Sequence, residues 1–77
     1  MAWRPPKRLL ILGKWVEVRV VSAEVIRDVV GDHDGADGAW DHDTMTIYLP
    51  RAATPAQRER AYWHELLHCL VDRFLDP

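Results

Sequence analysis

Hydrophobic and polar residues alternate in a stretch near the start of the chain, as they do in β-strands. In residues 15–21 the even-numbered positions are all valine, whereas charged or large residues occupy most of the odd-numbered positions. A period of two with many valines is typical of a strand that buries one face. Together with the apolar residues 8–12, this stretch predicts a β-hairpin. We expect Gly13 and Lys14 at the centre of a type II′ turn, because glycine takes the positive φ which that turn requires.

Two further elements are expected in the middle of the chain. Ser22 can cap a short helix over residues 23–30 that Gly31 would end, although the valines of this stretch would suit a strand equally well. Residues 32–43 are rich in aspartate and glycine and predict a loop, whose spacing does not match a calcium-binding EF-hand. Residues 44–49 alternate again and predict a strand, which Pro50 ends or marks as an edge strand.

The strongest pattern predicts one long helix at the end of the chain. Thr54, Pro55 and Gln57 form a helix start with a capping box, and no glycine or proline follows until after Leu75. At 100° per residue most of the large apolar side chains share one stripe, which we expect to pack on the sheet: Trp63, Leu66, Leu67, Leu70, Val71 and Phe74. The opposite side, expected to face solvent, carries Arg58, Tyr62, Cys69 and Arg73.

These elements predict an α+β fold, in which a small antiparallel sheet packs on one long C-terminal helix. A chain of 77 residues accommodates a single domain, which we place at residues 7–75, with residues 1–6 as a basic, proline-containing tail. The hydrophobic fraction of 48% is that of a folded protein, and the four tryptophans are expected to enlarge its core. A core this small is marginal, so a metal ion or a partner subunit is expected to stabilise it.

Charge and composition exclude several classes of function. A net charge of −2 argues against general nucleic-acid binding, which needs a basic face. The longest apolar run, residues 9–12, is far shorter than the roughly 20 residues of a membrane span and is too short for a secretory signal. The single cysteine cannot form an internal disulfide, so an intracellular, cytoplasmic location is expected.

The predicted C-terminal helix carries an H-E-x-x-H sequence at residues 64–68. His64 and His68 lie one turn apart on nearly the same face, so both imidazoles can reach one zinc ion. Glu65 stands beside that position and can accept a proton from an attacking water, then deliver it to a leaving amine. We therefore expect His64 and His68 to be zinc ligands and Glu65 to be a general base.

The motif and its surroundings resemble a known family. The order of Trp40-Asp41, the strand at residues 46–50, the helix start at residues 55–58 and the H-E-L-L-H sequence with Asp72 is similar to that of small zincin-like metallopeptidases. These occur as short bacteriophage-encoded proteins and as the ImmA/IrrE-type peptidase domain. The resemblance covers roughly residues 7–75, and only the five-residue motif is specific. It implies that an edge strand, expected at residues 44–49, lies beside the active-site helix and aligns an extended peptide.

The third zinc ligand is not evident from the sequence. Zincins generally take it from beyond the motif helix, and only nine residues follow His68. Asp72 lies too far along the axis to reach the metal easily, and is better placed to accept the other ring N–H of His68. His42 or a neighbouring aspartate could reach the metal from the loop at residues 32–43, although His42 reads more simply as a turn histidine in solvent. A ligand from a partner chain in a homodimer would also complete the site, and two protein ligands with extra water are the remaining arrangement.

The sequence thus predicts a zinc-dependent metallopeptidase with a peptide or protein substrate. The alternative is a zincin-derived binding or regulatory protein of reduced catalytic power, of the kind that a phage encodes, that contacts a host protein. The short segment after the motif favours this alternative, because it leaves little chain to supply a third ligand.

Overall fold

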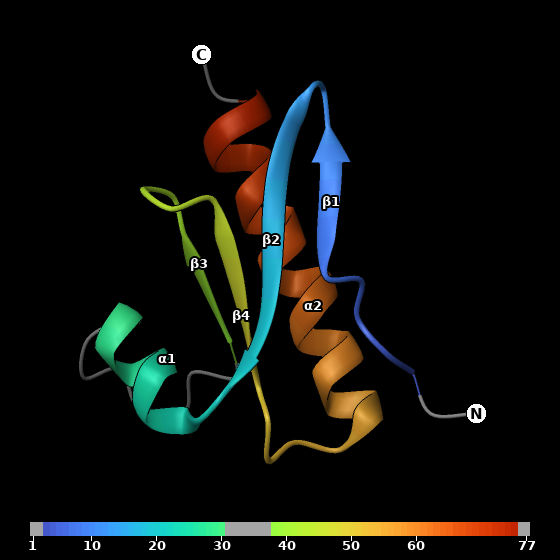
Figure 1. Cartoon of the computed structure of the whole chain (residues 1–77), viewed down its shortest axis with the longest axis vertical. Helices are drawn as coiled ribbons and strands as arrows, with labels where there is room; N and C mark the ends of the chain where they lie inside the picture. The colour runs from blue at the N-terminus through green and yellow to red at the C-terminus, as the bar shows by residue number, and fades with distance from the viewer. Residues whose placement is uncertain (1–2, 31–37, 76–77) are drawn as a thin grey trace.

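The computed structural model of the chain describes residues 3–30 and 38–75. It contains four strands, two α-helices and a π-helical end, in the order β1 (Arg8–Ile11), β2 (Lys14–Val21), α1 (Ala23–Val30), β3 (Ala39–Asp41), β4 (Thr46–Pro50), α2 (Pro55–Cys69) and η1 (Leu70–Leu75) (Figure 1). The helical prediction for residues 23–30 is therefore confirmed over the strand alternative. The predicted end of that helix at Gly31 lies outside the described residues, as does part of the predicted loop at 32–43. Strand β3 occupies residues of that predicted loop.

The strands form one sheet in the order β1-β2-β4-β3. The β1–β2 and β3–β4 pairs are antiparallel, but β2 and β4 are parallel, so the sheet is mixed and the prediction of an antiparallel sheet was wrong in that pairing. Helix α1 carries the chain across between β2 and the β3–β4 hairpin, which lets the second strand of that hairpin run alongside β2. Strand β4 is consequently internal, and the edge beside it is β3, not residues 44–49 as predicted.

The β1–β2 hairpin forms as expected, but its turn is shifted by one residue. Ile11 pairs with Lys14, which leaves Leu12 and Gly13 as the two central residues. Their φ angles are +49° and +82°, the signature of a type I′ turn. The predicted type II′ turn with Gly13 and Lys14 at its centre is therefore wrong. The type I′ geometry matches the right-handed twist of the strands and requires Leu12 to adopt the left-handed region.

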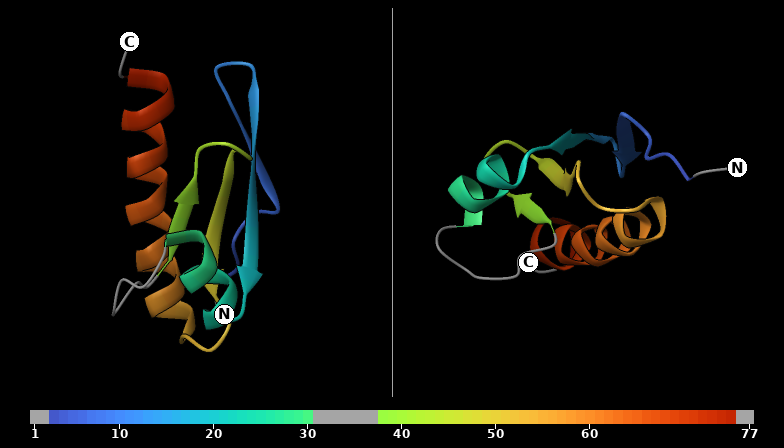
Figure 2. Two further views of the ribbon diagram at one scale, coloured as in Figure 1. Left: turned by 90° about the vertical axis from the view of Figure 1, so that its left-hand side faces the viewer. Right: turned by 90° about the horizontal axis from the view of Figure 1, so that it is seen from below.

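Helix α2 covers one face of the sheet and α1 lies at its β3 side (Figure 2). The core between the sheet and α2 consists of side chains that are at most 7% exposed: Val16, Val18, Ile47, Leu49, Ala61, Tyr62 and Cys69. The alternation predicted for β2 is confirmed by its buried valines. Trp3, which belongs to the predicted tail, instead packs on Tyr62 with its ring centroid 5.3 Å away.

The long C-terminal helix forms over the predicted residues, with the capping box of Thr54 and Gln57 in place. Its buried face is rotated relative to the prediction, since Leu66 and Phe74 of the predicted stripe pack against the core but the other half of the stripe does not. Tyr62 and Cys69 are buried, whereas Trp63, Leu67 and Val71 from the predicted packing stripe are 57%, 58% and 50% exposed.

Two features hold α2 in this orientation. The small residues Ala61 and Cys69 allow the helix axis to approach the sheet closely, which a face of Trp and Leu would prevent. Arg58, predicted to face solvent, donates hydrogen bonds of 2.8–3.2 Å to the carbonyl oxygens of Pro50, Arg51 and Ala53. These hydrogen bonds satisfy carbonyl oxygens of the turn that leads from β4 into α2. They therefore require the side of the helix that carries Arg58 to face this turn and the sheet.

Candidate metal centre

His64 and His68 project from successive turns of α2 on its exposed side. Their rings face one another, with centroids 4.6 Å apart, and the two Nε2 atoms are 3.1 Å apart. Two nitrogen atoms bound to one tetrahedral zinc ion at 2.0–2.1 Å would be about 3.3 Å apart. The sequence prediction that these imidazoles can converge is thus matched by their geometry, and the donor chemistry fits zinc.

Glu65 lies between these histidines and the buried face of α2. It is half-buried, and its side chain lies over Gly38. A Cβ atom added at position 38 would stand 3.3 Å from the Glu65 Cγ and 2.9 Å from the Tyr48 carbonyl oxygen. Glycine at position 38 therefore lets the chain entering β3 approach the helix at this point. Burial raises the pKa of Glu65, and the charges of His68 and His64 oppose that rise. A carboxylate with a raised pKa is a stronger base near neutral pH.

Asp72 is not placed as the sequence analysis predicted. In place of the expected partner His68, its Oδ2 atom accepts a hydrogen bond of 3.0 Å from Trp40 Nε1 and lies 3.3 Å from His42 Nδ1. Asp72 belongs to the π-helical segment η1, and its carboxylate reaches sideways to the β3–β4 turn. The contacts join residues about 30 positions apart, and no pattern in the sequence predicts that pairing, although each of the three residues stood out individually.

His42 occupies the first position of the turn after β3. Its Nε2 atom lies 3.2 Å from Asp43 Oδ1, and its side chain is 54% exposed. The turn histidine considered as an alternative ligand is thus partly in solvent, as expected for a turn, but both of its ring nitrogens contact a carboxylate.

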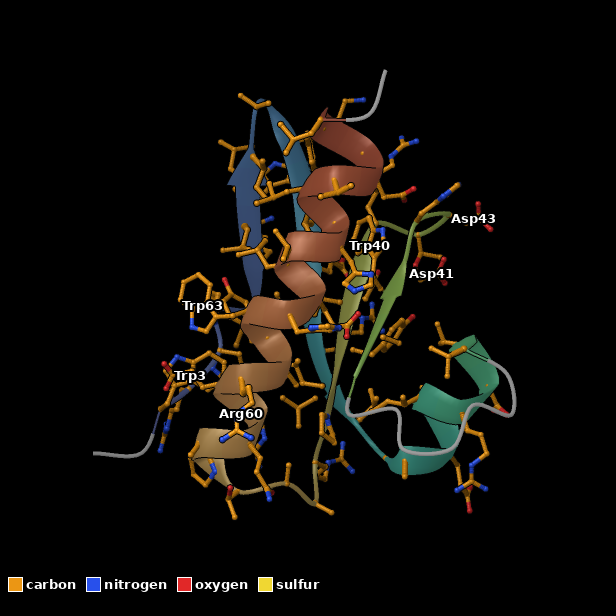
Figure 3. The ribbon with its side chains drawn as sticks, turned by 180° about the vertical axis from the view of Figure 1, so that it is seen from behind. Trp3, Trp40, Asp41, Asp43, Arg60 and Trp63 are labelled. Atoms are coloured by element: carbon orange, nitrogen blue, oxygen red, sulfur yellow. The ribbon has the colours of Figure 1, made fainter. Side chains whose placement is uncertain are left out.

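An open pocket of about 720 Å³ lies between α1, β3 and the end of α2. Val25, Val29 and Trp40 form its apolar wall, and its polar lining comprises Asp28, Asp41, His42, Asp43, His68 and Asp72. Figure 3 shows Trp40 on the flank of α2 that faces β3, with Asp41 and Asp43 beside it, and Trp63 on the other flank. The pocket therefore adjoins the edge strand β3 and includes one of the two predicted zinc ligands.

Within residues 3–30 and 38–75, no three histidine, cysteine, aspartate or glutamate side chains are gathered closely enough to hold one metal ion. His64 and His68 converge and their charges act on Glu65, while His42 and Asp72 line the same pocket as His68. Cys69 is fully buried on the sheet side of α2, where burial raises the pKa of its thiol.

Comparison with protein-family models, curated proteins and solved structures finds no match to this chain. The resemblance to zincin-like metallopeptidases therefore rests on the residues of the motif and their order alone. Among the described residues, no helix is both long and apolar enough to cross a membrane.

Proposed function

We propose that this protein is a zinc-dependent metallopeptidase. The observation that carries the proposal is the 3.1 Å separation of the His64 and His68 Nε2 atoms, with Glu65 on the adjoining helical position. A tetrahedral zinc site requires nearly this spacing, which in the metal-free protein is that of a hydrogen bond between the two rings. When bound, zinc would polarise a substrate carbonyl and lower the pKa of its bound water to about 7, so that the water can lose a proton at neutral pH. The lone cysteine supports action inside the cell.

Three residues of the chain would bind the metal and transfer the proton. His64 and His68 would hold the metal through Nε2, with the ring proton on Nδ1. Glu65 would accept a proton from the attacking water and pass it to the leaving amine. Its position in a half-buried gap against Gly38 limits the water around it, which keeps its proton affinity high.

The edge strand β3 suits an extended peptide substrate. One side of β3 pairs with β4, and the pocket that includes His68 adjoins β3. A peptide added to a free edge gains backbone hydrogen bonds whatever its sequence, and its alternate side chains would enter the pocket. This geometry replaces the arrangement expected from the sequence, in which residues 44–49 formed the edge.

The test combines metal content with hydrolysis. The purified protein should bind one zinc ion per chain by elemental analysis, and His64→Ala or His68→Ala should abolish that binding. Glu65→Gln should retain the metal and lose at least 100-fold in hydrolysis of a peptide library, since general bases contribute about 10²–10⁴-fold. Glu59→Gln, on the same helix, is the control. Absence of zinc from the wild-type protein would refute the proposal, and unchanged hydrolysis by Glu65→Gln would refute its catalytic part.

A second candidate is a zincin-derived protein that binds a host partner, with little or no hydrolysis. It is favoured by the observation that the described residues gather no group of three potential ligands. A zinc site with only two protein ligands binds weakly, and the fold would then serve as a scaffold. In that case EDTA would leave the thermal midpoint unchanged, whereas a metal-dependent enzyme would show a lower midpoint. A homodimer that completes the site would show zinc affinity rising with protein concentration.

A further inference from the structure

His64 and His68 alone leave a zinc ion one protein ligand short. Catalytic zinc sites have three protein ligands and keep the fourth position for water or substrate. If the missing ligand comes from the same chain, it must be a side chain that can approach His68. The pocket that includes His68 contains five further side chains with metal-binding atoms: Asp28, Asp41, His42, Asp43 and Asp72.

One contact of His42 is typical of a metal-binding histidine. Metal-binding histidines almost always donate their second ring N–H to a carboxylate or carbonyl, which fixes the tautomer and aims the free nitrogen at the ion. His42 Nδ1 lies 3.3 Å from Asp72 Oδ2, and the same oxygen accepts the Trp40 N–H at 3.0 Å. Trp40 thus holds the carboxylate that faces Nδ1, so Nε2, which contacts Asp43 at 3.2 Å, is the nitrogen that would bind a metal.

Of the pocket's four carboxylates, two already have partners and a third, Asp43, is largely exposed. The fourth, Asp28, is exposed on α1, where no hydrogen bond or ion pair among the described residues orients it. Asp72 Oδ2 faces two partners, and Asp41 Oδ1 accepts the backbone N–H of Asp43 at 3.0 Å within the turn. The Asp43 side chain is 90% exposed, so it is free to move away from His42 Nε2, which it contacts at 3.2 Å. Imidazole is also a common zinc ligand, and the two ligands already placed are of the same kind.

We propose that His42 is the third protein ligand of the zinc site and that Asp72 is its positioning residue. The inference rests on the proposed zinc binding. In the metal-free protein His42 Nε2 contacts Asp43 and the described residues gather no group of three potential ligands, so the proposal requires zinc to draw this nitrogen away from Asp43 toward His68. The motif helix and the β3–β4 turn are then joined by the metal as well as by the Asp72 contacts.

The experiment measures zinc affinity by competition with a chelator, together with zinc-edge X-ray absorption to count imidazole ligands. The wild-type protein should show three imidazoles. His42→Ala should show two and should lose affinity by more than the roughly 10- to 100-fold that loss of an outer partner costs. His33→Ala, which removes the chain's remaining histidine, should leave both values unchanged. Circular dichroism of each variant verifies that it is folded.

Asp72→Asn separates positioning from ligation. It should weaken zinc binding by about 10- to 100-fold while three imidazoles remain bound, which loss of a ligand could not produce. If His42→Ala binds zinc as tightly as the wild-type protein, or if His33→Ala is the variant that loses an imidazole, the assignment of His42 is wrong although the zinc site stands. If the wild-type protein binds no zinc, the proposed function fails and this inference fails with it.

Discussion

Glu65 illustrates how a single residue can be placed at a cost to stability. Its carboxyl group is half-buried between α2 and Gly38, and burial raises its pKa. A group whose pKa is higher in the folded state binds its proton more tightly there than in the unfolded chain. Its contribution to stability is therefore present below the unfolded pKa and is lost as the pH rises through the folded pKa.

In the metal-free protein, the substitution Glu65→Gln should remove the loss of stability that ionisation of Glu65 causes. We expect its free energy of unfolding at neutral pH to exceed that of the wild type, and the two proteins to converge in acid. One pKa unit corresponds to about 1.4 kcal/mol, and partial solvent contact reduces the effect, so a gain below about 1 kcal/mol is expected. Urea unfolding with EDTA at several pH values measures it. A glutamine variant less stable than wild type at neutral pH would contradict the burial argument.

At the scale of the element, the orientation of α2 decides which side chains surround the candidate site. The helix turns its small residues Ala61 and Cys69 to the sheet, and this leaves His64 and His68 at the surface near β3. Trp63, Leu67 and Val71 form an exposed apolar ridge on the other flank. The periodicity of a helix indicates which residues share a face, but several apolar faces compete when more than half of the circumference is apolar or small.

Two adjacent leucines provide a matched test of this orientation. Leu66 packs partly buried against the core, whereas Leu67 is 58% exposed. Leu66→Ala should lower the free energy of unfolding by about 1–3 kcal/mol, less than for a fully buried leucine. Leu67→Ala should change it by no more than about 0.5 kcal/mol, as surface substitutions do. Chemical denaturation of both variants measures the difference, and equal losses would return the helix to the orientation expected from the sequence.

At the scale of the whole molecule, the small core makes each buried residue important. Ile47 and Leu49 of β4 are fully buried beneath α2. A chain of 77 residues is expected to have roughly 4–12 kcal/mol of stability, and removing a buried isoleucine side chain costs about 2–5 kcal/mol. Binding of a ligand to the folded state alone adds about 2.7 kcal/mol at 100 times its dissociation constant.

The variant Ile47→Ala should therefore have a much lower thermal midpoint than the wild type, and zinc should restore part of the difference. Adding His64→Ala to Ile47→Ala should abolish this stabilisation by zinc, because the proposed zinc site then lacks one of its two histidines. Differential scanning calorimetry with and without zinc measures both effects. Equal stabilisation of the single and double variants would show that zinc acts elsewhere on the chain.

Features that depend on neighbours along the chain were predictable from the sequence. The alternation of residues 15–21, the capping box at Thr54 and the H-E-x-x-H spacing each act within a few residues, so β2, the long helix and the pairing of His64 with His68 follow from them. The α+β class follows from the same elements.

Features that depend on distant segments required the tertiary structure. Which face of α2 is buried depends on how closely Ala61 and Cys69 let the helix approach the sheet. Which strand forms the edge depends on the crossing made by α1. The contacts of Asp72 with Trp40 and His42 join segments about 30 residues apart. The sequence by itself determined the two histidines and the glutamate of the site, whereas only the packing of the β3–β4 turn against the end of α2 decided which further residues stand beside them.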